Sequence, residues 1–154
     1  MKNKLEKELI ELINLHDDIA EFGSSEDSVD NTWLIKAEEK LGVKFSDSYI
    51  WFLKNYSGGE ICGDEIYSIY GEEFESINGG DIVYQHLVKL KNNLTVPEKI
   101  IVHETDFGEI FFFNYSKLDC GECPIFLRLP SGDEIIYANN FYEFLKKRIE
   151  ACLE

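Results

Sequence analysis

The segment Cys120-Gly121-Glu122-Cys123 has the clearest spacing for chemistry in the sequence. Two cysteines separated by two residues can supply half of a zinc site, but no second pair of this kind is present. Cys62, His103 and Cys152 would complete such a site only if the fold brought them together. A thioredoxin-type redox pair needs a helix directly after it, whereas Pro124 leads into an apolar strand. We therefore expect no metal site, no obligatory disulfide in this segment, and reduced cysteines with structural or incidental roles.

Other patterns that carry catalysis are missing from the sequence. It contains no GxSxG nucleophile turn, no GxxxxGK[ST] phosphate loop, no GxGxxG fingerprint and no HExxH metal helix. The three histidines lie far apart, and carboxylates are too numerous for one acid/base pair to be singled out. Gly58-Gly59 and Gly79-Gly80 are interpreted as turns, because the surrounding acids would repel a bound phosphate. We expect no enzyme, no catalytic residue and no cofactor.

The charge balance restricts the class of partner. Thirty Asp and Glu residues against fifteen Lys and Arg give a net charge of -15, which repels nucleic acid and anionic membranes. The 44% hydrophobic content predicts a folded protein. No apolar run reaches the length of a membrane span, and the charged N-terminus lacks the apolar region of a signal peptide. We expect a cytoplasmic protein that binds neither membranes nor nucleic acid.

Two long stretches contain acidic residues and no Lys or Arg. Residues 8–35 hold eight acids, and residues 55–88 hold seven. The second set is the candidate surface for a basic protein partner: Glu60, Asp64, Glu65, Glu72, Glu73, Glu75 and Asp81. Glu104 and Asp106 form an alternative contact region, as does the N-terminal helix. The competing interpretation is a solvated rim with no partner.

The elements that would position these acids are centred on residues 33–59. Apolar residues at helical spacing predict two short helices that form a pair. A glycine after the first helix and Ser46 or Asp47 before the second supply the end and start signals. The residues that define the pair and its closing glycines are Trp33, Leu34, Ala37, Leu41, Gly42, Tyr49, Phe52, Leu53, Tyr56, Gly58 and Gly59.

The rest of the chain alternates helices with short strands. Helices are predicted over residues 3–22, over 82–92 after a capping Asp81, and after Asn139 or Asn140 near the C-terminus. Strands or hairpins are predicted over residues 60–69, 100–102, 110–115, 124–129 and 134–138. Short connections favour an antiparallel sheet, so the fold class is α+β. We expect one domain over 1–154, helical over 1–57, with the sheet and further helices over 58–154.

Several of these segments together resemble the SUKH superfamily. The resemblance rests on Ala37-Glu38, Leu41-Gly42, Tyr49, Phe52-Leu53, the run from Asn55 to Gly59, the Glu122-Cys123-Pro124 strand start, and Asn140 to Leu145 with Phe141 and Phe144. It spans about residues 30–150. Ser46 stands where the family usually has a proline, and a serine can also start a helix.

This resemblance implies the predicted fold and two possible functions. The superfamily includes bacterial toxin-immunity proteins and the fungal Smi/Knr cell-wall regulators. Its implied role for this chain is an immunity protein that binds a basic, nuclease-type toxin. The alternative is a cytosolic regulatory scaffold that binds other proteins. In either case we expect a monomer or weak homodimer, and a toxin gene beside this gene would separate the two.

Overall fold

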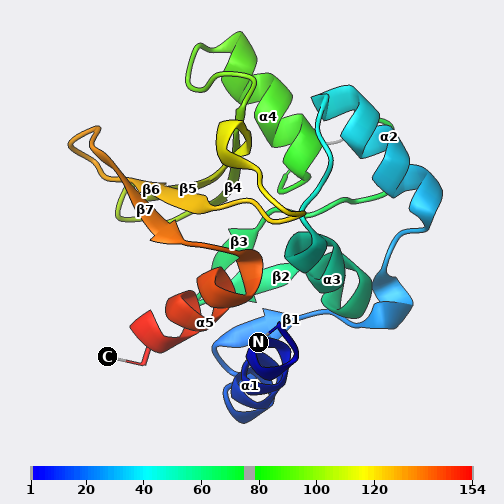
Figure 1. Cartoon of the computed structure of the whole chain (residues 1–154), viewed down its shortest axis with the longest axis vertical. Helices are drawn as coiled ribbons and strands as arrows, with labels where there is room; N and C mark the ends of the chain where they lie inside the picture. Colours follow the sequence, from blue (N-terminus) through cyan, green and yellow to red (C-terminus); the bar gives the residue numbers. More distant parts are fainter. Residues whose placement is uncertain (1, 75–78, 154) are drawn as a thin grey trace.

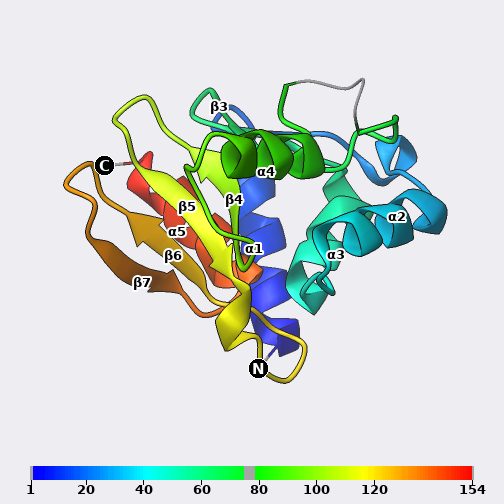
Figure 2. The same ribbon diagram turned by 90° about the horizontal axis from the view of Figure 1, so that it is seen from above.

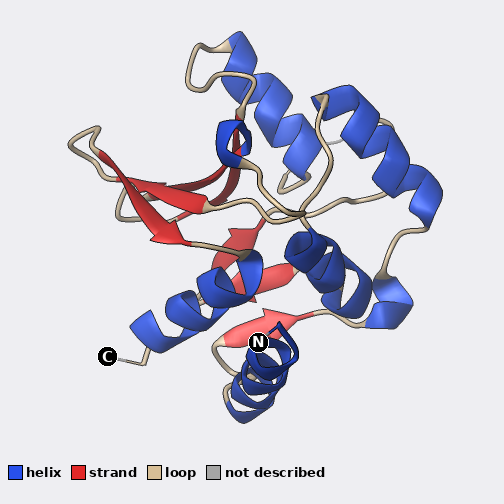
Figure 3. Cartoon of the chain, viewed as in Figure 1, coloured by secondary structure: helices blue, strands red, loops and turns tan. Residues whose placement is uncertain are grey.

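A seven-stranded antiparallel sheet forms the centre of the computed structural model, which describes residues 2–74 and 79–153 (Figures 1 and 3). The strands follow one another across the sheet in chain order, so every connection joins neighbours. This topology confirms the predicted α+β class with an antiparallel sheet. The strands are β1 (Ala20–Phe22), β2 (Gly59–Ile61), β3 (Asp64–Ile66), β4 (Lys99–Glu104), β5 (Ile110–Asn114), β6 (Ile125–Arg128) and β7 (Glu134–Ala138).

Five α-helices and two short 3-10 helices surround the sheet. They are α1 (Lys2–Leu15), η1 (Ser25–Asp27), α2 (Asn31–Leu41), α3 (Asp47–Tyr56), α4 (Ile82–Lys91), η2 (Tyr115–Lys117) and α5 (Phe141–Ala151). Helices α1 and α5 lie against each other, and α2 lies beside α4 (Figures 1 and 2). The Tyr142 hydroxyl donates to Glu6 Oε1 at 2.8 Å, and Lys146 pairs with Glu8 at 3.6 Å. These contacts fix the first helix onto the last.

The predicted helix signals stand where the sequence places them. Gly42 ends α2 with a φ of 72°, a left-handed conformation that glycine adopts without steric cost. Ser46, rather than Asp47, caps α3, because its side chain accepts the Tyr49 N–H. Asn140 caps α5 by accepting the Glu143 N–H at 2.9 Å. The helical pair predicted over residues 33–59 is therefore confirmed.

The core lies between one face of the sheet, here called the inner face, and helices α1, α3 and α5. Tyr49, Phe52, Phe113 and Phe141 are fully buried, and their rings meet in edge-to-face, tilted and stacked contacts. Of the three consecutive phenylalanines in β5, Phe111 and Phe113 belong to this core. The middle one points to the other face of the sheet, the outer face, and is also fully buried. The apolar strand is thus buried on both of its faces.

The motif segments meet in one hydrogen-bonded cluster. The Ser48 hydroxyl donates to Glu122 Oε1 at 2.6 Å and accepts the Phe141 N–H at 2.9 Å. A buried Glu38 carboxylate accepts the Phe45 N–H at 2.8 Å and so closes the turn between α2 and α3. Buried polar groups are stable only with such partners. These hydrogen bonds give the buried Glu38 carboxylate and the half-buried Glu122 carboxylate their partners.

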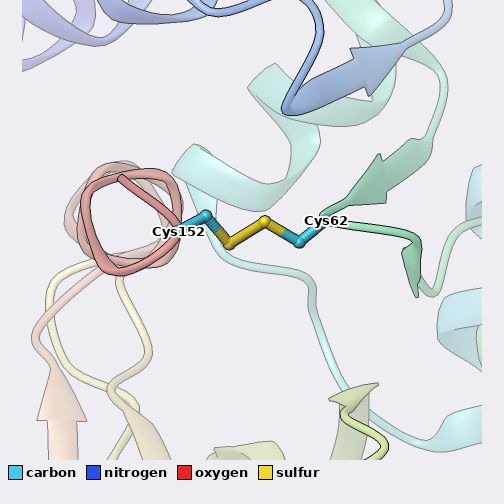
Figure 4. Close-up of a disulfide and its surroundings, with 2 residues drawn as sticks. All are labelled: Cys62 and Cys152. Atoms are coloured by element: carbon cyan, nitrogen blue, oxygen red, sulfur yellow. A yellow bond between two sulfur atoms is a disulfide. The ribbon is translucent and has the colours of Figure 1, made fainter. Parts of the chain in front are cut away.

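Two sequence predictions are wrong at this level. The helix predicted over residues 3–22 ends at Leu15, and Ala20–Phe22 instead pairs with β2 as an edge strand. Tertiary pairing has overridden the helical apolar pattern at this point. The expectation of reduced cysteines fails for Cys62 and Cys152, which form a disulfide between the end of β2 and the end of α5 (Figure 4). Cys120 and Cys123 are free thiols.

Candidate partner-binding surface

Three glutamates stand side by side on the outer face of strands β1, β2 and β3. Glu21 lies opposite Glu60, and Glu60 lies opposite Glu65. Their neighbours Ala20, Ile61 and Ile66 point inward and are buried, so the three carboxylates share the opposite face. Directly opposite residues on neighbouring strands have Cβ atoms about 5 Å apart. We call this row the glutamate ladder. Together with Gly59 it lines a surface hollow of about 320 Å³.

The ladder exists because β1 approaches β2 very closely. Gly59 has a φ of 146°, and a Cβ at this position would overlap Glu21 O and the Cα of Phe22. Only glycine therefore permits this pairing. On the inner face the Phe22 ring packs edge-on against Phe52, with ring centres 5.2 Å apart. Core packing thus holds β1 in place even though the outer side of the pair brings like charges together.

Glu65 has a fixed orientation within the ladder. The Tyr70 hydroxyl donates to Glu65 Oε2 and accepts the Gly80 N–H at 2.7 Å. A Cβ at Gly80 would overlap the Glu65 carboxylate, so this glycine makes room for it. Burial and the hydrogen bond to Glu65 raise the pKa of Tyr70 to about 12, which keeps its proton available for donation. Glu65 is therefore held in one orientation by the Tyr70 hydroxyl, which the Gly80 N–H positions in turn.

A second acidic group lies beside the ladder, where β3 and the β4–β5 turn come together. Burial raises the pKa of Asp64, and the charges of Asp106, Glu60 and Glu109 raise it further. The Arg148 guanidinium opposes this shift. Arg148 is itself buried, with its guanidinium carbon 4.9 Å from the centre of the Phe111 ring. This second group thus has a cation close by, whereas no ion pair to Glu21, Glu60 or Glu65 is found among residues 2–74 and 79–153.

The predicted partner-binding residues lie in different parts of the structure. Glu60 and Glu65 belong to the ladder, Asp64 and Asp106 to the second group, and Glu72 and Glu73 are exposed in the loop after β3. Glu104 is partly buried, pairs with Lys89 at 3.3 Å and accepts the Tyr67 hydroxyl. The Glu104 carboxylate thus makes contacts within the protein that connect β4 to α4 and to Tyr67. Glu75 lies outside the described residues.

Asp81 is wrong as a partner-binding residue. It is fully buried, and its carboxylate accepts the Tyr84 N–H at 2.9 Å and the Tyr70 N–H at 3.0 Å. Asp81 therefore caps α4 and fixes the chain that carries Tyr70, and it presents no charge to a partner. The helix that it caps was predicted correctly.

Sequence reasoning missed two acids of this surface, Glu21 and Glu109. Glu21 was assigned to a helix, so its place opposite Glu60 was not foreseen. The pattern of Ala20 and Phe22 on either side of it, followed by Gly23, is also typical of a short strand. Glu109 follows the Gly108 turn and lies outside the two acidic stretches considered in the sequence.

Two of the three histidines, His86 and His103, are part of the interior. His103 is fully buried, and its Nδ1 lies 2.9 Å from Glu65 O. Burial lowers its pKa to about 4, so the ring is neutral at pH 7 and its Nδ1 donates to that carbonyl. His86 is also buried, and burial lowers its pKa. Among residues 2–74 and 79–153, no three His, Cys, Asp or Glu side chains converge as metal ligands would.

Comparison with known protein families places the chain in one family. The family model SUKH_6, described as SMI1-KNR4 cell-wall, matches residues 31–145. The chain belongs to the SUKH superfamily. No curated protein matches it. SUKH proteins are generally non-enzymatic immunity or regulatory proteins, which points to a protein partner.

Only part of the candidate surface lies within the residues that match the SUKH family. It starts at the first residue of α2 and ends within α5, so it includes the hydrogen-bonded cluster, Glu60 and Glu65. Helix α1 and strand β1, with Glu21, lie before it. Within the described part of the chain, no helix combines the length and the hydropathy that a membrane crossing requires.

Proposed function

We propose that this SUKH protein is an immunity protein that binds and neutralises a basic, nuclease-type toxin in the cytoplasm. The glutamate ladder is the observation that carries the proposal. Like charges directly opposite each other in a sheet destabilise it by roughly 0.2–1 kcal/mol per pair. Two such pairs in a row, on a face open to solvent, are explained if a partner supplies the missing positive charge.

A nuclease supplies that charge in its nucleic-acid-binding groove. Lys and Arg side chains that neutralise phosphates there would meet carboxylates spaced along three strands. The fixed Glu65 would lose little side-chain freedom on binding, which lowers the entropic cost. The field of the whole surface would also speed encounter, because steered association rises by about 10–1,000-fold at low salt.

The test compares two variants with the same net charge. One is Glu21→Gln/Glu60→Gln/Glu65→Gln, which removes the ladder. The other is Glu11→Gln/Glu39→Gln/Glu150→Gln, which removes three exposed acids from α1, α2 and α5. The partner is the protein encoded beside this gene, and its toxicity in the presence of each variant is scored first. Association rates are then measured at increasing salt.

We expect the ladder variant to associate at least 10-fold more slowly than the wild type at low salt, and the matched variant to stay close to the wild type. Near 1 M salt, where the screening length is about 3 Å, all three rates should converge. The matched variant should keep its folding stability, since exposed charges contribute about 0–1 kcal/mol each. Unfolding of the ladder variant is measured alongside, because Glu60 and Glu65 are half-buried and Glu65 accepts the Tyr70 hydroxyl. Equal slowing in both variants would show that net charge, and not the ladder, governs the encounter.

A regulatory scaffold is the second candidate, favoured by the cell-wall description of the matching family. Such a protein would bind cytosolic partners through the same acidic surface, as a monomer or weak homodimer. It would give no rescue from a neighbouring toxin. Rescue of toxin-expressing cells by the wild type therefore separates the two candidates.

A further inference from the structure

The disulfide between Cys62 and Cys152 connects two segments separated by 90 residues in the sequence. Cys62 is exposed in the turn between β2 and β3, and Cys152 is half-buried at the C-terminal end of α5 (Figure 4). We propose that this bond is a reversible redox tether that fixes the β2–β3 hairpin to α5. The inference goes beyond the proposed function, and its test needs no partner.

The strands of the hairpin are anchored by the buried Ile61 and Ile66, but its turn lies outside the core. Each of its strands has three residues, and its central pair is Glu60 opposite Glu65. The two turn residues, Cys62 and Gly63, have φ angles of 52° and 83°. A left-handed conformation is unfavourable for a residue with a side chain. A covalent bond at Cys62 therefore acts where the hairpin is weakest.

The other end of the tether is rigid. Cys152 is the cap of α5, and its N–H lies 3.1 Å from Ile149 O. The preceding turns of α5 bury Phe144, Leu145 and Ile149 completely in the core. Closing the bond thus ties a short, charge-strained hairpin to one of the best-packed helices of the molecule.

The exchange chemistry needs only glutathione disulfide as oxidant. One cysteine thiolate attacks a glutathione sulfur, forms a mixed disulfide and releases one glutathione thiolate. The second cysteine thiolate then attacks the protein sulfur and releases the other. The two cysteines lose two electrons, the glutathione disulfide gains them, and the two cysteine protons pass to the two released glutathione thiolates. Excess reduced glutathione reverses both steps.

The remaining cysteines are poor competitors for this exchange. Cys123 is buried, and burial raises its pKa to about 12. Cys120 is exposed, but its hydrogen bond to Asp119 raises its pKa. Thiolates, not thiols, are the attacking species. The pairing of Cys62 with Cys152 is therefore the favoured product.

The test follows the full-length chain in glutathione disulfide and in excess reduced glutathione. Alkylation followed by peptide mapping reports which cysteines are bonded, and thermal unfolding reports stability. A bond that closes so long a loop is expected to raise the unfolding midpoint by on the order of 10 °C. Hydrogen exchange at residues 59–66 should slow in the oxidised form. Cys120→Ser, which removes an exposed free thiol, should behave as the wild type.

Cys62→Ser should unfold at the midpoint of the reduced wild type in both buffers. If this variant does not fold, the wild type in the two buffers still gives the answer. Free Cys62 and Cys152 after incubation with glutathione disulfide would overturn the proposal. So would a midpoint that is the same in both buffers, or a bond that excess reduced glutathione fails to open.

Discussion

The two ends of the sheet, β1–β3 and β4–β7, differ in the charges on their outer face. Opposite charges are paired at one end, and like charges are adjacent at the other. At the β4–β7 end, Glu134 of β7 lies opposite Arg128 of β6, with Nε and Oε2 2.9 Å apart. It also pairs with Lys99 of β4 at 2.8 Å. The hydrogen bonds from these two cations outweigh burial and lower the pKa of Glu134. At the β1–β3 end, three glutamates lie directly opposite one another on neighbouring strands.

A buried aromatic ring under Arg128 and Lys99 explains why the charges are paired at the β4–β7 end. Phe112 of β5 is fully buried and stacks on Phe126, and the Arg128 and Lys99 side chains cover its ring. The cations there protect apolar surface from water and neutralise Glu134 at the same time. The ladder has Gly59 in its hollow and no such ring. This sheet can thus pair its charges across strands, and the ladder departs from that pattern.

The largest expected effect is that of Phe52→Ala, which tests whether the β1–β3 and β4–β7 ends of the sheet unfold together. Phe52→Ala removes a fully buried ring that touches Phe22 of β1 and Phe141 of α5, so it should destabilise the protein by roughly 3–5 kcal/mol. Chemical unfolding gives the free energy, and hydrogen exchange at residues 20–22 and 111–113 reports each end. We expect both ends to lose protection equally. Loss confined to residues 20–22 would mean that the ladder end melts alone.

The next effect acts at the boundary between the ends. The register between β3 and β4, within the described residues, is the single pair Ile66 and His103. The His103 ring faces Phe111 and Phe144, and its pKa is also influenced by Arg148 and Glu104. A proton on this ring would place a charge in the core and next to a guanidinium. Acid should therefore weaken the boundary before it affects either end.

The sign of this effect follows from the lowered pKa. The unfolded chain takes up the proton near pH 6.5, and the folded chain only near pH 4. Above pH 6.5, His103 therefore leaves the free energy of unfolding unchanged. As the pH falls to 4, it lowers that free energy progressively, by about 3 kcal/mol in total. The measurement is the difference in unfolding free energy between the wild type and His103→Gln. This difference should shift by that amount between pH 6.5 and 4, and a constant difference would contradict the argument.

The sequence predicted the elements whose signals are local. The start of α3 after a cap at Ser46 or Asp47, the end of α2 at Gly42 and the strands of the β4–β7 end all depend on residues close together in the sequence. Ala20–Phe22 failed because a three-residue strand carries too little pattern, and its partner strand lies about 40 residues further along the chain. Pairing across such distances is decided by the whole fold.

The candidate surface was predicted in outline and not in detail. The stretch without Lys or Arg contains Glu60 and Glu65, which lie opposite each other in the structure, and their role in binding a partner remains a prediction. Charge counts do not distinguish a capping carboxylate from an exposed one, so Asp81 was included and Glu21 was missed. The link from Cys62 to Cys152 spans 90 residues and has no local signal at all.

The smallest effect tests the comparison most directly, because it predicts opposite signs for one substitution at the two ends. Glu134→Gln removes a charge that two cations bind, and should destabilise the protein by about 0.2–1 kcal/mol. Glu60→Gln removes the central charge of the ladder and two repulsions with it, so it should stabilise the protein by a similar amount. Both substitutions keep the shape of the side chain.

The measurement is the free energy of unfolding for each variant at low salt and near 1 M salt. Screening should bring both variants back toward the wild type, because both effects are electrostatic. Glu11→Gln, on the exposed side of α1, is the control for the loss of one negative charge. If Glu60→Gln is no more stable than this control, the ladder carries no repulsion. A partner would then not be needed to explain it, and the strongest support for the immunity proposal would be lost.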